Sequence, residues 1–191
     1  MKRVVFLDRD GTINDNKQGY TSSPEDFELY SFAGKSIQKL NELGFLVFVV
    51  TNQSGIARGY YTLDDLAAIH TKMEKGLRED GAKVDEIYFS PYHIEGKIEP
   101  YNISHEDRKP ELGMFKKAMT KHDFRINKSY MVGDNYSDVA FGKKAGLTTI
   151  LVKTGYGEKI FMENRAEWEY KPDYVVKDLW AAALLIEELD R

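Results

Sequence analysis

The chain has 191 residues, a length that predicts one domain with a substantial buried core. Its net charge of −4, with 42% hydrophobic and 30% charged residues, is ordinary for a globular protein and argues against nucleic acid as the main partner. Cysteine is absent, which excludes disulfides and thiolate metal sites.

The first predicted strand is the apolar run at residues 4–7, and two carboxylates, Asp8 and Asp10, follow it directly. In open α/β sheets, ligands bind beyond the carboxyl ends of the strands, so this pair is a candidate active site. An Asp at such a place can hold a cation or act as a nucleophile. The alternative is that Asp10 and Gly11 only form a turn, and this motif alone does not decide between the two.

Residues 14–30 are polar and aromatic and are predicted to form a long, partly ordered loop of the kind that often carries function. After this loop, apolar spacing and end signals predict helices and strands in alternation. The predicted elements are helix 36–43, strand 45–50, helix 62–80, strand 84–89, helix 111–122, strand 130–132, helix 137–145, strand 147–152, strand 174–176 and helix 179–189. Residues 158–170 are charged and contain Trp168, and they are expected to form a surface helix without an assigned function.

This alternation predicts an α/β fold, in which helices cover both faces of a central parallel sheet. The predicted strands are continuous apolar runs, as such a buried sheet requires. Because no repeat, linker or low-complexity segment interrupts the chain, we expect a single domain over residues 1–191.

Polar residues follow several of the predicted strands. Thr51 begins such a segment after strand 45–50, Asp134 and Asp138 follow strand 130–132, and Lys109 precedes a helix. Because parallel strands end at one edge of a sheet, we expect at least three of these groups to meet. Carboxylates, a hydroxyl and a lysine together suit phosphoryl transfer assisted by Mg²⁺, which prefers oxygen ligands. Taken singly, each has a plainer explanation, such as a strand end, a solvated charge or a helix cap.

The ordered combination of these motifs resembles the haloacid dehalogenase-like (HAD) phosphohydrolase superfamily, over residues 3–152. A closer resemblance, to the D,D-heptose 1,7-bisphosphate phosphatase family and its sister family of histidinol-phosphate phosphatases, rests on four segments. They are residues 6–14 (FLDRDGTIN), 19–20 (GY), 51–59 (TNQSGIARG) and 108–110 (RKP). The resemblance implies a three-layer Rossmann-like HAD fold whose cap is minimal and made only of loops.

The resemblance also implies roles for five residues in a Mg²⁺-dependent phosphatase. Asp8 would be the nucleophile that forms an aspartyl-phosphate, and Asp10 the general acid and base. Asp8, the backbone carbonyl of Asp10 and Asp134 would bind Mg²⁺. Thr51 and Lys109 would stabilise the transferred phosphoryl group.

Further roles implied by the resemblance concern the substrate. Arg108 would contact it, and its guanidinium could bind two oxygens of a second phosphate. Asp138 would support Lys109 or the metal from behind. The other expected substrate contacts are Gly19, Tyr20, Asn52, Gln53, Ser54 and Arg58.

The chain departs from the family in a loop that often carries zinc through a Cys-x-His…Cys-x-Cys pattern. Here the corresponding residues are Ser90-Pro91-Tyr92 and His105-Glu106-Asp107. A structural zinc site needs about four ligands in a tetrahedral array, which these residues do not supply, so we expect no zinc. We expect packing of Pro91, Tyr92 and Tyr101 to hold the loop instead. In a second departure, Asn135 stands where a basic residue often follows Asp134.

The favoured reaction is hydrolysis of D-glycero-D-manno-heptose 1,7-bisphosphate to the heptose 1-phosphate. Histidinol phosphate is the closest rival substrate. A nucleic acid 3′-phosphatase, a phosphotransferase and a non-catalytic module that binds sugar phosphates are less favoured alternatives. We also expect a cytoplasmic monomer with no nucleic-acid or membrane partner, because no long apolar stripe or membrane-length apolar run appears.

Overall fold

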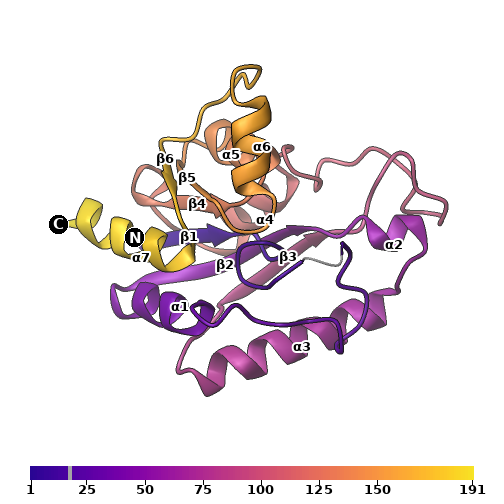
Figure 1. Cartoon of the computed structure of the whole chain (residues 1–191), viewed down its shortest axis with the longest axis horizontal. Coiled ribbons are helices and arrows are strands. Elements are labelled where there is room, and N and C mark those ends of the chain that lie inside the picture. The colour runs from indigo at the N-terminus through magenta and orange to yellow at the C-terminus, as the bar shows by residue number, and fades with distance from the viewer. Residues whose placement is uncertain (17–18) are drawn as a thin grey trace.

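A computed structural model describes residues 1–16 and 19–191 of the chain. Six strands form one sheet in the order β3-β2-β1-β4-β5-β6, and all five neighbouring pairs are parallel (Figure 1). The strands are β1 (Arg3–Leu7), β2 (Phe45–Asn52), β3 (Glu86–Ser90), β4 (Tyr130–Gly133), β5 (Thr148–Val152) and β6 (Tyr174–Val176). β1 and β4 therefore lie side by side in the middle of the sheet, although over a hundred residues separate them in sequence.

The helices cover both faces of this sheet. They are α1 (Ala33–Glu42), α2 (Gly55–Arg58), α3 (Leu63–Glu79), α4 (Gly113–Lys121), α5 (Tyr136–Lys144), α6 (Gly157–Asn164) and α7 (Leu179–Asp190), with a short 3-10 turn at Ile126–Lys128. Val5 and Leu7 pack in one core with α1, α3 and α7, while Val4 and Phe6 pack in a second core with α4 and α5. Alternate residues of β1 thus face opposite layers, which confirms the predicted three-layer α/β fold.

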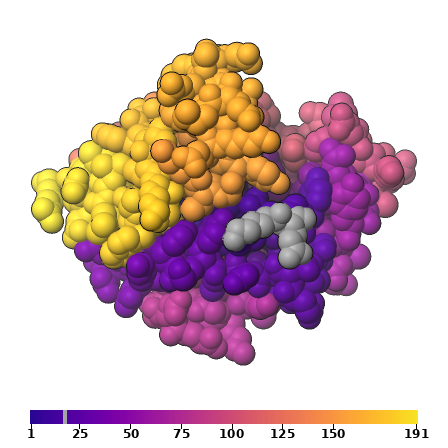
Figure 2. All heavy atoms as spheres, in the orientation of Figure 1, coloured from indigo at the N-terminus to yellow at the C-terminus, as the bar shows by residue number. Residues whose placement is uncertain are grey.

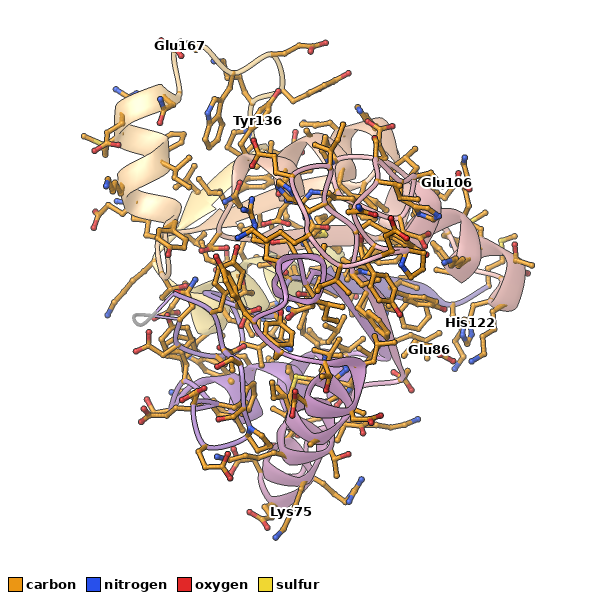
Figure 3. All side chains as sticks on the ribbon, turned by 90° about the vertical axis from the view of Figure 1, so that its right-hand side faces the viewer. Lys75, Glu86, Glu106, His122, Tyr136 and Glu167 are labelled. Carbon is orange, nitrogen blue, oxygen red and sulfur yellow. The ribbon has the colours of Figure 1, made fainter. Side chains whose placement is uncertain are left out.

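Aromatic packing and a polar contact fix α4 on its face of the sheet. The ring of Phe6 lies 5.6 Å from that of Phe48 and 5.8 Å from that of Phe115, in the second core. At the sheet margin, His122 Nε2 lies 3.0 Å from Glu86 Oε1, and these two side chains approach each other in Figure 3. The loop before α4 carries the predicted site residue Lys109, so this packing also fixes where that loop begins and ends.

Several element boundaries differ from the sequence-based expectations. The helix expected to start at residue 111 starts at Gly113, because Glu111 and Gly113 N–H groups first close turns onto Arg108 and Glu106 carbonyls. α2 was not predicted, since a helix of four residues shows no periodicity. α3 begins with a capping box, in which the Thr62 hydroxyl accepts from Asp65 N–H at 3.2 Å.

The segment at residues 158–170 is helical only in its first half, as α6. Trp168 is buried beyond this helix, with its ring 5.0 Å from that of Tyr136 and 6.0 Å from that of Phe161. This cluster packs on α5 and β5, close to the ends of the central strands. In Figure 2, α6 and the loop after β3 stand apart at the upper edge of the molecule. Within the described residues, no helix is both long and apolar enough to cross a membrane.

Candidate active site

Three carboxylates meet at the carboxyl edge of the sheet. Oxygen atoms of Asp8, Asp134 and Asp138, from the ends of β1 and β4 and the first turn of α5, all lie within 4.8 Å of one another. Gly11 makes this approach possible, because a Cβ on it would lie 2.2 Å from Asp134 Oδ2 and its φ is +81°. Carboxylate oxygens so arranged fit a hard divalent cation.

Lys109 supplies a positive charge to this group from the loop before α4. Its Nζ lies 3.0 Å from Asp8 Oδ1 and 2.6 Å from Asp138 Oδ1, and it donates to the Val50 carbonyl at 2.7 Å. Asn52 holds the lysine backbone on both sides, accepting from Lys109 N–H at 2.9 Å and donating to its carbonyl at 3.1 Å. Asp138 accepts from Asn135 N–H through its other oxygen, so Asp8 and Asp134 are the better placed metal ligands.

Burial sets the charges of this group. Burial and the charge of Asp138 raise the pKa of Asp8 to about 7, although Lys109 opposes the shift. Burial and the charge of Asp8 also raise the pKa of Asp134. Burial opposes the charge of Lys109, but Asp138 and Asp8 outweigh it and raise the lysine pKa. One lysine therefore does not balance three acids, and a divalent cation would favour their ionised forms.

Asp10 sits in a different environment two residues along the chain. Four neighbours donate hydrogen bonds to its carboxylate: Arg9 Nη2 at 2.9 Å, Asn14 Nδ2 at 3.0 Å, Thr21 Oγ1 at 3.2 Å and Gln53 Nε2 at 2.8 Å. Burial alone would raise the pKa of Asp10, but the Arg9 charge and these hydrogen bonds lower it. Asp8 and Asp10 thus have pKa values shifted in opposite directions, because their surroundings differ in charge and in hydrogen bonding.

Both carboxylates open into one cavity of about 450 Å³. Its lining residues are Asp8, Asp10, Asn16, Gly19, Tyr20, Asn52, Ser54, Arg108, Lys109, Asp134, Asn135, Ser137 and Tyr156. A cation, an ammonium and a guanidinium on its wall would attract a phosphorylated ligand, since each can bind phosphate oxygens.

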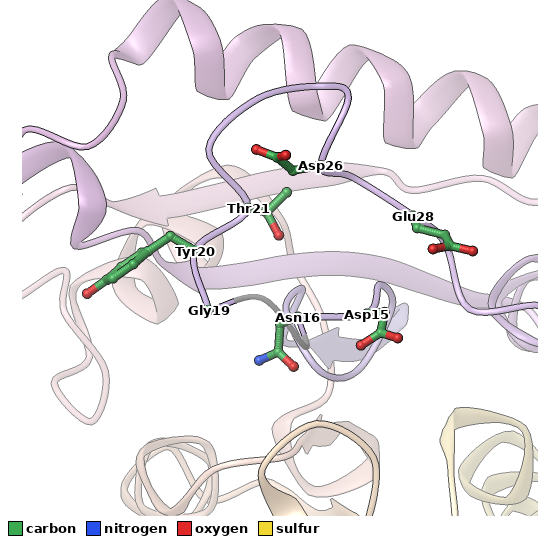
Figure 4. A pocket seen from close by; sticks show the side chains of 7 residues that line it. All are labelled: Asp15, Asn16, Gly19, Tyr20, Thr21, Asp26 and Glu28. Carbon is green, nitrogen blue, oxygen red and sulfur yellow. The ribbon is translucent and has the colours of Figure 1, made fainter.

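A smaller hollow of about 140 Å³ adjoins this cavity and is shown in Figure 4. It shares Asn16, Gly19 and Tyr20 with the larger one, and its other lining residues are Asp15, Thr21, Asp26 and Glu28. Its described lining is acidic and holds no basic side chain, so it does not suit an anionic group.

Comparisons with known proteins agree with this geometry. The model of the HAD-hydrolase-like family matches residues 107–182. The D-glycero-D-manno-heptose-1,7-bisphosphate 7-phosphatase of Thermosynechococcus vestitus is 36% identical over 183 residues, which cover 94% of this chain and 92% of that protein. The chain belongs to this phosphatase family of the HAD superfamily. It is therefore a phosphoric monoester hydrolase.

Two further relatives support this assignment. The D-glycero-beta-D-manno-heptose-1,7-bisphosphate 7-phosphatase of Pasteurella multocida is 41% identical over 156 residues, covering 81% of this chain and 84% of that protein. The crystal structure of the D,D-heptose 1,7-bisphosphate phosphatase of B. bronchiseptica, complexed with magnesium and phosphate, superposes with a TM-score of 0.83. It is 30% identical and covers 99% of both chains. That related protein thus holds magnesium and phosphate on the same fold.

Most of the residues expected at the phosphatase site line the cavity, but four do not. Thr51 and Gln53 lie just beneath it, each 1% exposed, and Asp138 lies behind Lys109. Arg58 points instead to the loop after β3, where its Nη2 lies 3.2 Å from His93 Nε2 and from Glu95 Oε2. Arg58 is therefore not among the residues that line the cavity.

Four lining residues were not expected from the sequence: Asn16, Asn135, Ser137 and Tyr156. Tyr156 follows β5, and its N–H donates to Asp134 Oδ2 at 2.8 Å. Its place after a strand is the same signal that identified Asp8, and it could have been used here. Ser137 and Asn135 belong to the start of α5, and the sequence marks Asn135 only as a departure from the family pattern.

The loop of the phosphatase that lacks the zinc-binding pattern is held by aromatic contacts. Tyr92 stacks on His105 with ring centres 3.8 Å apart, and its ring lies 5.9 Å from that of Tyr101. The expected packing of Tyr92 and Tyr101 is present, and His105 is a partner that was not expected. His105 Nδ1 also accepts from Asp107 N–H at 3.1 Å, so this nitrogen is engaged in a hydrogen bond within the loop.

His70 makes the stability of the phosphatase depend on pH. Burial, followed by the Arg9 charge, lowers the pKa of this imidazole to about 3. Because the unfolded chain binds a proton near pH 6.5 and the folded chain does not, stability falls as pH drops from about 6.5 towards 3. Between pH 7.5 and 5, we expect the unfolding free energy of His70→Leu to fall by about 2 kcal/mol less than that of the wild type. Urea unfolding at both pH values measures this, and parallel losses in the two proteins would contradict it.

Proposed function

We propose that the enzyme hydrolyses D-glycero-D-manno-heptose 1,7-bisphosphate to the heptose 1-phosphate, through an aspartyl-phosphate on Asp8. The observation that carries the proposal is the opposite environment of two carboxylates in one cavity, Asp8 beside Lys109 and Asp10 beside Arg9. The names of the relatives supply the substrate.

In the first step, a carboxylate oxygen of Asp8 attacks phosphorus and the bond from phosphorus to the sugar oxygen breaks. Asp10 gives its proton to that leaving oxygen. In the second step, Asp10 takes a proton from water, which attacks the phosphorus of the aspartyl-phosphate and releases inorganic phosphate and free Asp8. The lowered pKa of Asp10 favours this second role, and a phosphate dianion bound beside it would raise the pKa for the first.

The surrounding residues would stabilise the charge that moves in both steps. Lys109 lies 3.0 Å from Asp8 Oδ1, where its ammonium can stay close to the transferred phosphoryl group. The hydroxyl of Thr51 accepts from Gln53 at 2.8 Å, which leaves its own proton to be donated. Mg²⁺ held by Asp8, Asp134 and the backbone carbonyl of Asp10 would supply a Lewis acid to the phosphoryl oxygens.

Arg108 favours the bisphosphate over histidinol phosphate. It is partly buried at the cavity wall. Burial and the charge of Arg58 lower its pKa, and Tyr20 opposes this shift. Its guanidinium suits the second phosphate of a bisphosphate and would repel the ammonium group of histidinol phosphate. We expect the enzyme to use no zinc and to bind neither membranes nor nucleic acid. We also expect it to be a cytoplasmic monomer.

Phosphate release with Mg²⁺ from a panel of substrates tests the proposal. The panel holds both anomers of the heptose 1,7-bisphosphate, fructose 1,6-bisphosphate, histidinol phosphate and a 3′-phosphorylated oligonucleotide. We expect the highest kcat/KM for one heptose anomer. A higher value for histidinol phosphate or the oligonucleotide would assign the enzyme to that substrate instead.

Replacing Arg108 by Ala tests the assigned second phosphate. We expect KM for the bisphosphate to rise about tenfold or more, since a charged hydrogen bond contributes about 1.5–3 kcal/mol, while KM for heptose 7-phosphate changes little. Arg125→Ala is the matched control, because Arg125 is exposed near the other end of β1. Equal rises in KM for both substrates would mean that Arg108 does not read the second phosphate.

A further inference from the structure

The amide of Gln53 connects the two halves of the site. Its Nε2 donates to Asp10 Oδ2 at 2.8 Å and to Thr51 Oγ1 at 2.8 Å. One amide group therefore sets the position of the proposed acid and of the hydroxyl beneath the phosphoryl group. Since Gln53 is 1% exposed, solvent cannot replace these hydrogen bonds without opening the fold.

Tyr61 holds this amide from the other side. Its hydroxyl donates to Gln53 Oε1 at 2.6 Å, and Arg9 Nη2 donates to the same oxygen at 3.2 Å. Both donors require an oxygen at that end of the amide, and the Asp10 carboxylate requires a nitrogen at the other. The orientation of Gln53 is thus determined by its neighbours, and Tyr61 lies one step further from the cavity than any expected site residue.

His70 completes the cluster on the far side of Arg9. Its Nε2 lies 3.3 Å from Arg9 Nη1, and a guanidinium nitrogen can only donate. His70 Nε2 must therefore accept, which fixes the neutral ring with its proton on Nδ1. Arg9 is fully buried, so α3 positions the cation that grips both oxygens of Asp10.

We propose that Tyr61 is a positioning residue, which acts through Gln53 to aim the Asp10 carboxyl at the leaving oxygen of the substrate. The inference rests on the proposed role of Asp10 as the general acid. Tyr61 itself is not among the residues that line the active-site cavity, and it borders a separate hollow with Ile56 and Leu63. Loss of its hydroxyl leaves Gln53 Oε1 with the longer hydrogen bond from Arg9 Nη2, at 3.2 Å, so the amide and the Asp10 carboxyl that it holds are less firmly directed.

The test compares two kinds of substrate in Tyr61→Phe. kcat/KM reports the steps up to the first irreversible one, the transfer to Asp8. An alkyl phosphate needs its leaving oxygen protonated in that transfer, whereas 4-nitrophenyl phosphate, with a good leaving group, does not. We expect the ratio of the alkyl to the aryl kcat/KM to fall about tenfold, part of the 10²–10⁴-fold that a positioned acid supplies. The alkyl substrate is whichever member of the panel the wild-type enzyme hydrolyses fastest.

This ratio separates positioning from damage to the fold. Misfolded protein lowers both kcat/KM values equally and leaves the ratio unchanged. Phe keeps the ring that packs on Gly55, where a Cβ would come within 2.1 Å of the tyrosine. Tyr88→Phe is the matched control, since the hydroxyl of Tyr88 is buried without a partner among the described residues, and its ratio should equal that of the wild type.

Asp10→Asn separates the inference from the role on which it rests. We expect the ratio to fall in this variant by more than in Tyr61→Phe. If it falls in Asp10→Asn and not in Tyr61→Phe, Asp10 is the acid and Tyr61 does not position it. If it falls in neither, the assigned role of Asp10 is wrong and the inference falls with it. If another substrate of the panel has a higher kcat/KM than the heptose bisphosphate, only the proposed substrate is corrected, and the roles of Asp10 and Tyr61 are not affected.

Discussion

Replacing Asp8 by Asn should lower kcat at least about 10⁴-fold on every substrate, because an amide cannot attack phosphorus. The substitution is nearly isosteric, so the cavity and its other lining residues should keep their positions. Phosphate release under Mg²⁺ saturation measures the effect, and thermal unfolding of the same preparation shows whether the variant is folded.

The matched control for this substitution is Asp123→Asn, at an exposed acid that follows α4. Its kcat should equal that of the wild type. A folded Asp8→Asn protein that keeps a kcat within tenfold of the wild type would mean that another group attacks phosphorus.

Replacing Lys109 by Met should impair both catalysis and folding. Lys109 is 3% exposed and pairs with Asp8 and Asp138, so its removal leaves the three carboxylates without this counter-charge. Breaking a buried ion pair from one side costs about 3–5 kcal/mol, and loss of an electrostatic stabiliser costs about 10²–10³-fold in kcat. Urea unfolding in the presence of a chelator measures the first effect, and phosphate release with Mg²⁺ measures the second.

An exposed lysine serves as the control for Lys109→Met. Lys116 pairs with Glu106 at the surface, with the two side chains 66% and 62% exposed, and Lys116→Met should change the unfolding free energy by less than about 1 kcal/mol. A Lys109→Met protein as stable as the wild type at pH 7 would contradict the account, because it would mean that the three acids tolerate one another without the lysine.

The sequence was sufficient to predict the sheet and the carboxylates at its edge. Apolar runs end directly before Asp8 and Asp134, so the rule that parallel strands end together placed both groups correctly. The family resemblance assigns Lys109 to the same site. The structure shows how it is held there, because Asn52, at the end of β2, hydrogen-bonds to both its backbone N–H and its backbone carbonyl.

The supporting contacts behind the site could not be predicted in this way. Tyr61 and His70 reach Asp10 only through Gln53 and Arg9, and nothing in their local sequence distinguishes them from packing residues. The structure also gives Arg58 neighbours that the sequence did not suggest. Arg58 lies in a segment that resembles the family, but its guanidinium lies beside His93 and Glu95.

The loop after β3 illustrates how a changed residue set can keep a loop ordered. Tyr92 and His105 stand where the family pattern has a zinc ligand at each position, and their rings stack 3.8 Å apart. The sequence predicted that Tyr92 packs but not on which partner, because the stacking depends on how the loop returns to α4.

The most direct test of the central claim is to trap the phosphorylated enzyme. Asp10→Asn, mixed with Mg²⁺ and 4-nitrophenyl phosphate, lacks the base that activates water but needs no acid to release the aryl group. We expect phosphate to accumulate on the protein, close to one per chain, and peptide mass spectrometry to place it on Asp8. Release of 4-nitrophenol over many turnovers with no phosphate on Asp8 would contradict the account.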